Sequence, residues 1–223
     1  MQQGKSIASS AVWVLLTAAG ILLNAFVIVC PKLVAQGQFS DGSWALLQRN
    51  GALFILATAV MGAFLLKGPL GRTNPHVLLF GITQLILLVI YLALGTILNP
   101  RVIFLNAFAQ RIHDGVNYAT LTNYVSELQS KVSAGTKSSF DLKTQEFPPC
   151  IRELFAQPRP SGVVLFGSDK QLQRVMFLWK GNRFRWGIEI TYKMPGKYPV
   201  TMGISKVEER GVWPDVSCFT ANH

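Results

Sequence analysis

The residue pair best suited to acid–base chemistry is His113 followed by Asp114. A carboxylate beside an imidazole can hold its orientation and tautomer, which a general base requires. Together with Arg111, the pair defines one hypothesis, a membrane-bound enzyme whose site forms at the bilayer surface. That hypothesis predicts a concave pocket at these residues. The simpler interpretation is the solvated start of a surface helix.

No other set of residues in the sequence has the spacing of a catalytic or metal-binding motif. His76 falls in a membrane loop, and His223 is the last residue. The sequence contains no nucleophile elbow, zinc-protease motif, P-loop or dinucleotide-binding motif, and its carboxylates are scattered. We therefore expect no catalytic, cofactor-binding or metal-binding residues and no cofactor, which favours a non-enzymatic protein.

The three cysteines show no metal-binding or redox spacing. Cys30 sits in an apolar run, which is typical of a small buried residue. Cys150 and Cys218 both fall in the more polar second half of the chain. They form a possible disulfide if that half faces an oxidising compartment, and two free thiols if it faces the cytoplasm.

Cations and aromatic residues alternate along the stretch from 174 to 193. In an extended strand, alternation places the two kinds on opposite faces, whereas a base-stacking surface needs both on one face. We therefore expect the aromatic face to lie in the core, and we expect no binding to nucleic acid. The opposite face is a possible surface for an anionic partner, and its members are Arg174, Lys180, Arg183 and Arg185.

Three apolar stretches precede this region and predict a membrane domain at 1–108. The sequence is 50% hydrophobic and 14% charged, and no charged residue lies between Arg72 and Arg101. A helix needs about 20 residues to cross a hydrocarbon core, so we expect spans at about 8–30, 50–67 and 76–99. The first run is too long for a signal peptide and lacks a good cleavage site. Without ionisable groups in their apolar interiors, the spans indicate an anchor rather than a transport pathway.

Residues 109–223 predict one small α+β domain, with a helix packed on a mostly antiparallel sheet of four or five strands. Apolar residues at helical spacing indicate a helix over about 115–134, with Asp114 as its N-cap. Residues 133–146 are polar and read as a loop. Pro214 would confine the last strand to a sheet edge. The strands are expected at about 162–167, 173–180, 183–192, 199–207 and 212–219.

Two of these strands form a predicted hairpin with Gly181-Asn182 as its turn. With that turn, Lys180 opposes Arg183, and the ladder that follows places Phe177 against Trp186. The same register places Arg174 against Glu189, where the two charges could form an ion pair.

The expected function is a membrane-anchored binding or assembly module, an accessory subunit of a membrane complex. Its expected partners are the lipid bilayer and other membrane protein subunits. Basic residues near the span ends nearly balance, with a slight bias that places the N-terminus inside. We therefore expect an integral protein of the plasma or inner membrane with its soluble domain outside the cytoplasm. The remaining alternative is an envelope ligand sensor, which would need a cavity in the sheet domain.

Overall fold

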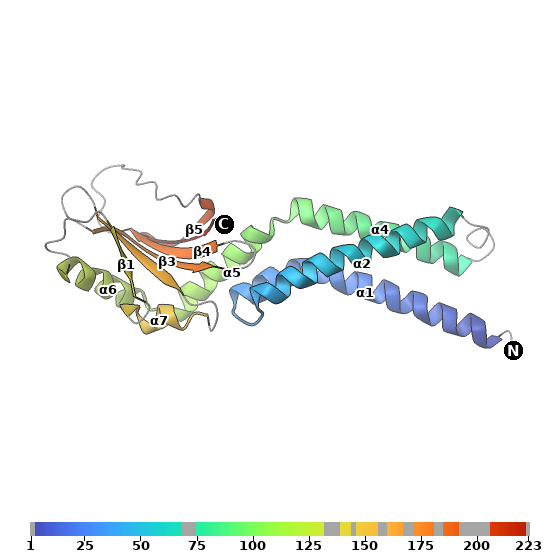
Figure 1. Cartoon of the computed structure of the whole chain (residues 1–223), viewed down its shortest axis with the longest axis horizontal. Coiled ribbons are helices and arrows are strands. Elements are labelled where there is room, and N and C mark those ends of the chain that lie inside the picture. Colours follow the sequence, from blue (N-terminus) through green and yellow to red (C-terminus); the bar gives the residue numbers. More distant parts are fainter. Residues whose placement is uncertain are drawn as a thin grey trace. The chain divides into compact units, whose positions relative to one another are not determined.

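The chain folds into two compact units in the computed structural model (Figure 1). The membrane unit comprises Met1–Pro31 and Ser43–Pro100, and the sheet unit comprises Lys32–Gly42 and Arg101–His223. The structure describes residues 3–67, 75–131, 139–143, 146–155, 160–166, 172–180, 185–191 and 206–221.

The membrane unit is built from α1 (Gln3–Ala35) as far as Pro31, α2 (Asp41–Lys67) from Ser43 onward, and α4 (Pro75–Ile97). All three helices are long and apolar enough to cross a membrane, which indicates an integral membrane protein. The predicted fold class is confirmed. The helices extend beyond the predicted spans, because α1 continues to Ala35 and α2 already begins at Asp41, whose carboxylate favours a helix start.

Glycines let the three helices approach closely. A Cβ atom on Gly81 of α4 would lie 2.9 Å from the carbonyl oxygen of Gly62 in α2, and one on Gly20 of α1 would lie 2.9 Å from Leu87. The Asn24 amide then donates to the Leu87 carbonyl oxygen at 3.4 Å, linking α1 to α4. Small residues and interhelical polar contacts are the usual means of packing helices within lipid.

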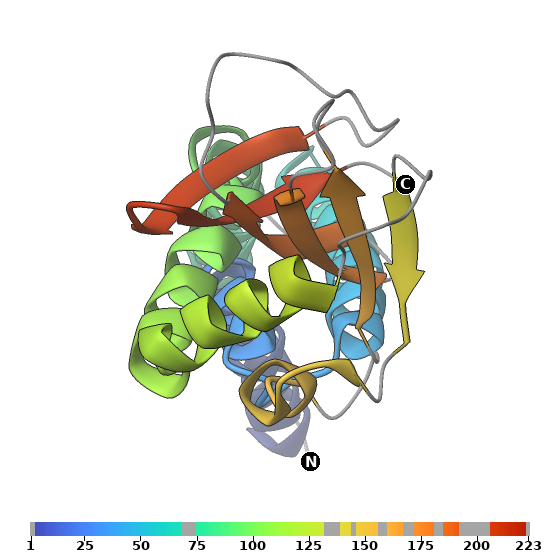
Figure 2. The ribbon, with the colours of Figure 1, turned by 90° about the vertical axis from the view of Figure 1, so that its left-hand side faces the viewer.

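The described part of the sheet unit has six antiparallel strands in the order β1-β2-β3-β4-β6-β5. Its helices α5, α6 and α7 lie on one face of the sheet, as Figure 2 shows. The helices are α5 (Pro100–Gly115), α6 (Tyr118–Lys131) and α7 (Pro149–Arg152). The strands are β1 (Ser139–Leu142), β2 (Ser161–Phe166), β3 (Leu172–Lys180), β4 (Arg185–Thr191), β5 (Lys206–Trp213) and β6 (Val216–Ala221).

Aromatic rings fill the core between α5 and the sheet. Phe104 meets the ring of Trp186 at 5.4 Å between centroids, and Phe108 meets Trp179 at 5.9 Å. All four side chains are almost fully buried. The expectation that the aromatic face of the β3–β4 pair forms the core is confirmed. The sequence-based boundary at 108, however, assigns this part of α5 to the membrane domain, whereas its side chains belong to the sheet unit.

Helix α6 packs on the same face through Leu121, Val125 and Leu128, three of the residues whose spacing predicts it. Its N-cap is Asn117 rather than Asp114, because the Asn117 side-chain oxygen accepts from the backbone N–H of residues 119 and 120. Asp114 instead lies at the end of α5, so the predicted single helix from 115 begins later, at Tyr118.

The β3–β4 hairpin forms with a register different from the predicted one. Lys180 opposes Arg185, and Phe177 opposes Ile188, a shift of two residues that keeps every side chain on its predicted face. The connection is therefore longer than two residues, and the predicted turn Gly181-Asn182 lies outside the described residues.

Three other predictions about the sheet differ from the structure. A strand, β1, pairs with β2 inside the predicted loop 133–146. Pro214 lies in the turn between β5 and β6, so β6 is an internal strand that pairs with β4, and β5 forms the edge. The predicted strand 199–207 falls mostly outside the described residues, where β5 begins only at Lys206.

Candidate partner-binding surface

Three aromatic rings pack against one another on the surface of the sheet unit. The imidazole of His113 lies 5.9 Å from the Trp213 ring with an interplanar angle of 23°, and Trp213 lies 5.3 Å from Tyr118. The His113 side chain is 61% exposed, Tyr118 is 38% exposed, and Trp213 is half-buried. We call these three residues the aromatic surface cluster.

Three elements far apart in the sequence position the cluster. His113 is in the last turn of α5, Tyr118 opens α6, and Trp213 ends β5. The Tyr118 hydroxyl donates to Asp215 Oδ1 at 2.8 Å, which joins the α6 start to the β5–β6 turn. The Asp215 carbonyl oxygen in turn accepts from the Thr191 N–H at 2.8 Å, which anchors that turn to the end of β4.

Two carboxylates flank the cluster and set its charge. Asp114 accepts from the Gln110 amide at 2.9 Å and lies 3.3 Å from His113 Nδ1. These hydrogen bonds, chiefly that of Gln110, lower the pKa of Asp114. The hydrogen bond to Asp215 raises the pKa of Tyr118, so its hydroxyl remains a donor. The two carboxylates place negative charge beside the rings on a chain of net charge +10.

The residues of the hypothetical enzyme site separate in the structure. His113 and Asp114 are 61% and 62% exposed. Arg111 points to a different part of the sheet unit, where its guanidinium lies 4.7 Å from the Phe155 ring centroid and donates to the Ala35 carbonyl oxygen. Two residues along a helix correspond to about 200°, so Arg111 and His113 emerge on opposite sides of α5.

The predicted anionic-partner surface maps to the sheet face opposite the helices. Arg174 lies 3.5 Å from Glu189, an ion pair that was expected from the sequence and that survives the shift in register as a diagonal contact. Arg174 is only 19% exposed, so little of its side chain is available to a partner. Lys180 is exposed and Arg185 is half-buried, while Arg183 lies outside the described residues.

This opposite face is also partly apolar. Met176, Phe219 and Ala221 are buried on it, and Leu178 packs against them. A Cβ atom on Gly187 would lie 2.7 Å from the Phe219 ring, so a glycine is required beneath it. This face, which the sequence predicts to be lined by cations, therefore also contains a small apolar cluster.

All three cysteines are free thiols in the structure. Cys218 is fully buried on β6, and its thiol lies 3.8 Å from the Leu105 carbonyl oxygen. Burial raises the pKa of Cys218 to about 12 and also raises that of the half-buried Cys150. The possible disulfide between Cys150 and Cys218 is thus not formed.

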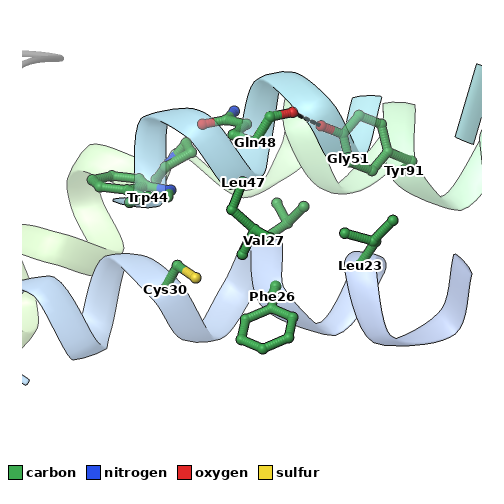
Figure 3. Close-up of a pocket in the computed structure, with 10 residues that line it drawn as sticks. Leu23, Phe26, Val27, Cys30, Trp44, Leu47, Gln48, Gly51 and Tyr91 are labelled. Atoms are coloured by element: carbon green, nitrogen blue, oxygen red, sulfur yellow. Dashed lines mark hydrogen bonds between the residues drawn. The ribbon is translucent and has the colours of Figure 1, made fainter. Parts of the chain in front are cut away.

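Cys30 lines a small cavity in the membrane unit together with Trp44 and Tyr91 (Figure 3). The Tyr91 hydroxyl donates to the Gln48 carbonyl oxygen at 3.4 Å across its wall. The cavity measures about 20 Å³, which is enough for one water molecule but not for a substrate.

Sequence reasoning did not identify Trp213, Asp215 or Tyr118 as parts of a site. No local pattern marks them, since Tyr118 and Asp215 are 97 positions apart in sequence.

Searches of family models, characterised proteins and solved structures give no match to this chain. Tyr and Trp are residue types that are enriched at protein interfaces.

Proposed function

We propose that this protein is a membrane-anchored, non-enzymatic binding or assembly module, an accessory subunit that holds another membrane protein through the aromatic surface cluster. The observation that carries the proposal is the surface contact of the His113, Trp213 and Tyr118 rings, with Tyr118 held by its hydrogen bond to Asp215. Such rigid aromatic side chains lose little entropy on binding and dominate many interfaces.

The charge of the cluster supports a basic segment as the part of the partner that docks there. Asp114 and Asp215 flank the rings, and the faces of Trp213 and Tyr118 attract cations. An Arg or Lys side chain docked at the rim of the cluster would meet both an aromatic ring and a carboxylate. The carboxylates beside the rings would attract such a segment during encounter.

We propose that the protein lies in a plasma or inner membrane and that its sheet unit is outside the cytoplasm. Lys5, Lys67 and Arg72 then fall on the cytoplasmic side. On the other side, Arg111 contacts Ala35 and Phe155 within the sheet unit. We therefore do not count Arg111 among the basic residues that favour a cytoplasmic position for that side. An impermeant maleimide applied to intact cells should label Cys150, the half-exposed thiol; labelling only after the cells are broken would place the unit inside.

The test of binding is co-purification after mild detergent extraction. We expect the full-length protein to bring down another membrane protein, and Trp213→Ala to lose that protein about tenfold or more, as for an interface hot spot. Val212→Ala is the matched control, because it removes a half-buried side chain from the neighbouring position of β5. A strictly monomeric protein, or equal recovery with both variants, would argue against the proposal.

A further inference from the structure

We infer that His113 makes binding at the aromatic surface cluster sensitive to pH, so that a basic partner segment is released when the imidazole gains a proton. The inference rests on the proposed function, because it concerns how tightly the cluster holds such a segment. Histidine is the side chain whose charge ordinarily changes between pH 5 and 8. The cluster therefore holds a basic segment near neutral pH and releases it in mild acid.

The Asp114 carboxylate is an exposed anionic contact at one edge of the cluster. Its side chain is 62% exposed, and both of its oxygens accept from the Gln110 amide at 2.9 Å. Because an amide carries no charge, the carboxylate keeps its negative charge while the neighbouring imidazole is neutral. An Arg or Lys side chain of the partner can then pair with it.

A protonated His113 occupies both contacts that attract a partner cation. Its Nδ1 atom lies 3.3 Å from Asp114 Oδ1, and in the protonated ring this nitrogen is a charged donor. The imidazole and Trp213 centroids are 5.9 Å apart, within the roughly 6 Å at which a cation is attracted to an aromatic face. The imidazolium is thus an internal competitor for the carboxylate and for the aromatic ring.

The imidazolium also repels the incoming charge. The His113 side chain is 61% exposed and lies beside the carboxylate that the partner would use. A cation bonded to Asp114 Oδ1 at about 3 Å would lie no more than about 6 Å from His113 Nδ1. Two positive charges at that separation repel each other, so protonation and binding of the segment oppose one another.

Asp215 and Arg210 are further charged groups on the elements packed around His113. Asp215 accepts from the Tyr118 hydroxyl, and Arg210 precedes Trp213 by three positions on β5. Aspartate and arginine side chains ordinarily stay charged between pH 5 and 8. These two charges are therefore constant over the range in which the imidazole titrates.

The hydrogen bonds of Asp114 and Tyr118 leave His113 as the group of the cluster that titrates near neutrality. The hydrogen bond from the Gln110 amide is the main cause that lowers the pKa of Asp114, so this carboxyl group stays ionised in mild acid. The hydrogen bond to Asp215 raises the pKa of Tyr118, so its hydroxyl stays neutral. Between pH 5.5 and 7.5, the charge of the cluster therefore changes through His113.

The test measures binding of a rhodamine-labelled hexa-arginine peptide to the full-length protein in non-ionic detergent, by fluorescence anisotropy at low ionic strength. We expect the peptide to bind about fivefold more weakly at pH 5.5 than at pH 7.5, the effect of one added positive charge near the bound cation. His113→Phe keeps an aromatic ring that cannot be protonated, so the ratio of its two affinities should be close to one, whatever their absolute values. His76→Phe, which replaces an exposed histidine of the membrane unit, is the matched control and should retain the fivefold ratio.

The outcomes distinguish the pH effect from the binding function itself. If the peptide does not bind at pH 7.5, or binds the wild-type protein and Trp213→Ala equally, the cluster does not bind basic segments and both proposals fail. If Trp213→Ala weakens binding but the wild-type ratio is one, or if His113→Phe retains the fivefold ratio, only the pH effect is overturned. If His113→Phe does not fold, His113→Gln provides a second side chain that does not titrate, with the same expected ratio.

Discussion

Arg111 Nη1 donates a hydrogen bond to the carbonyl oxygen of Ala35 at 3.1 Å, so a cation of α5 caps the last turn of α1. Helix C-termini leave carbonyl groups unsatisfied and attract positive charge. Gly37 completes the cap with a φ of +70°, and its N–H donates to the Val34 carbonyl oxygen. The same guanidinium lies over Phe155, and its partial burial lowers the pKa of Arg111.

Replacing Arg111 with lysine is expected to destabilise the protein by about 1–2 kcal/mol, because lysine keeps the charge but loses the planar stacking and the directed hydrogen bond. Arg152→Lys on α7 is the control, since Arg152 is exposed, and it should have no effect. Denaturant unfolding followed by tryptophan fluorescence measures both. Equal stability of the two variants would show that the contact contributes nothing.

Gly37→Ala tests the same contact from the other side. A Cβ atom there would lie within 3 Å of the Arg111 guanidinium, in a backbone conformation that costs about 1 kcal/mol for alanine. We expect the destabilisation by Gly37→Ala to fall in an Arg111→Ala background, where only the backbone cost remains. Additive effects in this double-mutant cycle would contradict the close approach of the two residues.

In the membrane unit, Gly81→Ala should weaken the packing of α2 against α4. The added Cβ would meet Leu66 at 2.7 Å and the backbone of Gly62 at 2.9 Å, and backbone atoms cannot move aside cheaply. Gly115→Ala places its Cβ in open space and serves as the control. We expect a lower melting temperature in detergent for Gly81→Ala alone.

The ion pair on the sheet face predicts a loss and a rescue. Arg174→Met leaves the nearly buried Glu189 carboxylate without this partner, which should cost about 2–3 kcal/mol in unfolding free energy. Adding Glu189→Leu should restore much of the loss, since an apolar pair avoids burying a charge. Lys180→Met, at an exposed position of the same strand, should be close to neutral. Failure of the double variant to recover would assign the cost to packing instead.

The buried thiol of Cys218 predicts a loss of stability at alkaline pH. In the unfolded chain a cysteine ionises near pH 9.0, whereas burial raises the pKa of Cys218 in the folded protein to about 12. The folded state therefore holds the proton longer, and its stability falls between pH 9 and 12 by about 1.4 kcal/mol per pH unit.

Denaturation midpoints across this pH range, compared between the wild-type protein and Cys218→Ala, isolate the contribution of the thiol. The Cys218→Ala curve should be shallower from pH 9 upward. Ionisation of Tyr124, whose pKa burial raises to about 12, would add a slope that starts nearer pH 10 and is common to both proteins. Parallel curves from pH 9 to 10 would contradict the assignment.

The sequence predicts much of this fold because its patterns are strong. The run from Val77 to Leu98 has the length and apolar character that lipid requires, and the alternation in β3 and β4 places Phe177 and Trp179 in the core. The hairpin register is wrong by two residues because an even shift preserves both faces, so the alternating pattern cannot distinguish the two registers.

The candidate site could not be predicted from the sequence because long-range contacts define it. The rings of His113 and Trp213 stack although they are 100 positions apart, and each lies in a locally unremarkable turn or helix end. Likewise, the apolar tract around Phe104 and Phe108 resembles a continuation of the membrane helices by composition. Only the position of Trp186 and Trp179 in the sheet shows that its side chains belong to the sheet unit.

The most direct test of the account is site-specific photo-cross-linking in intact membranes. A photoactivatable residue at Pro214, an exposed position beside Trp213, should give one discrete adduct with another membrane protein. The adduct should disappear in a Trp213→Ala background and should not form from Arg152, an exposed position on α7. An absent adduct at Pro214, or one that Trp213→Ala leaves undiminished, would contradict the proposed function of the aromatic surface cluster.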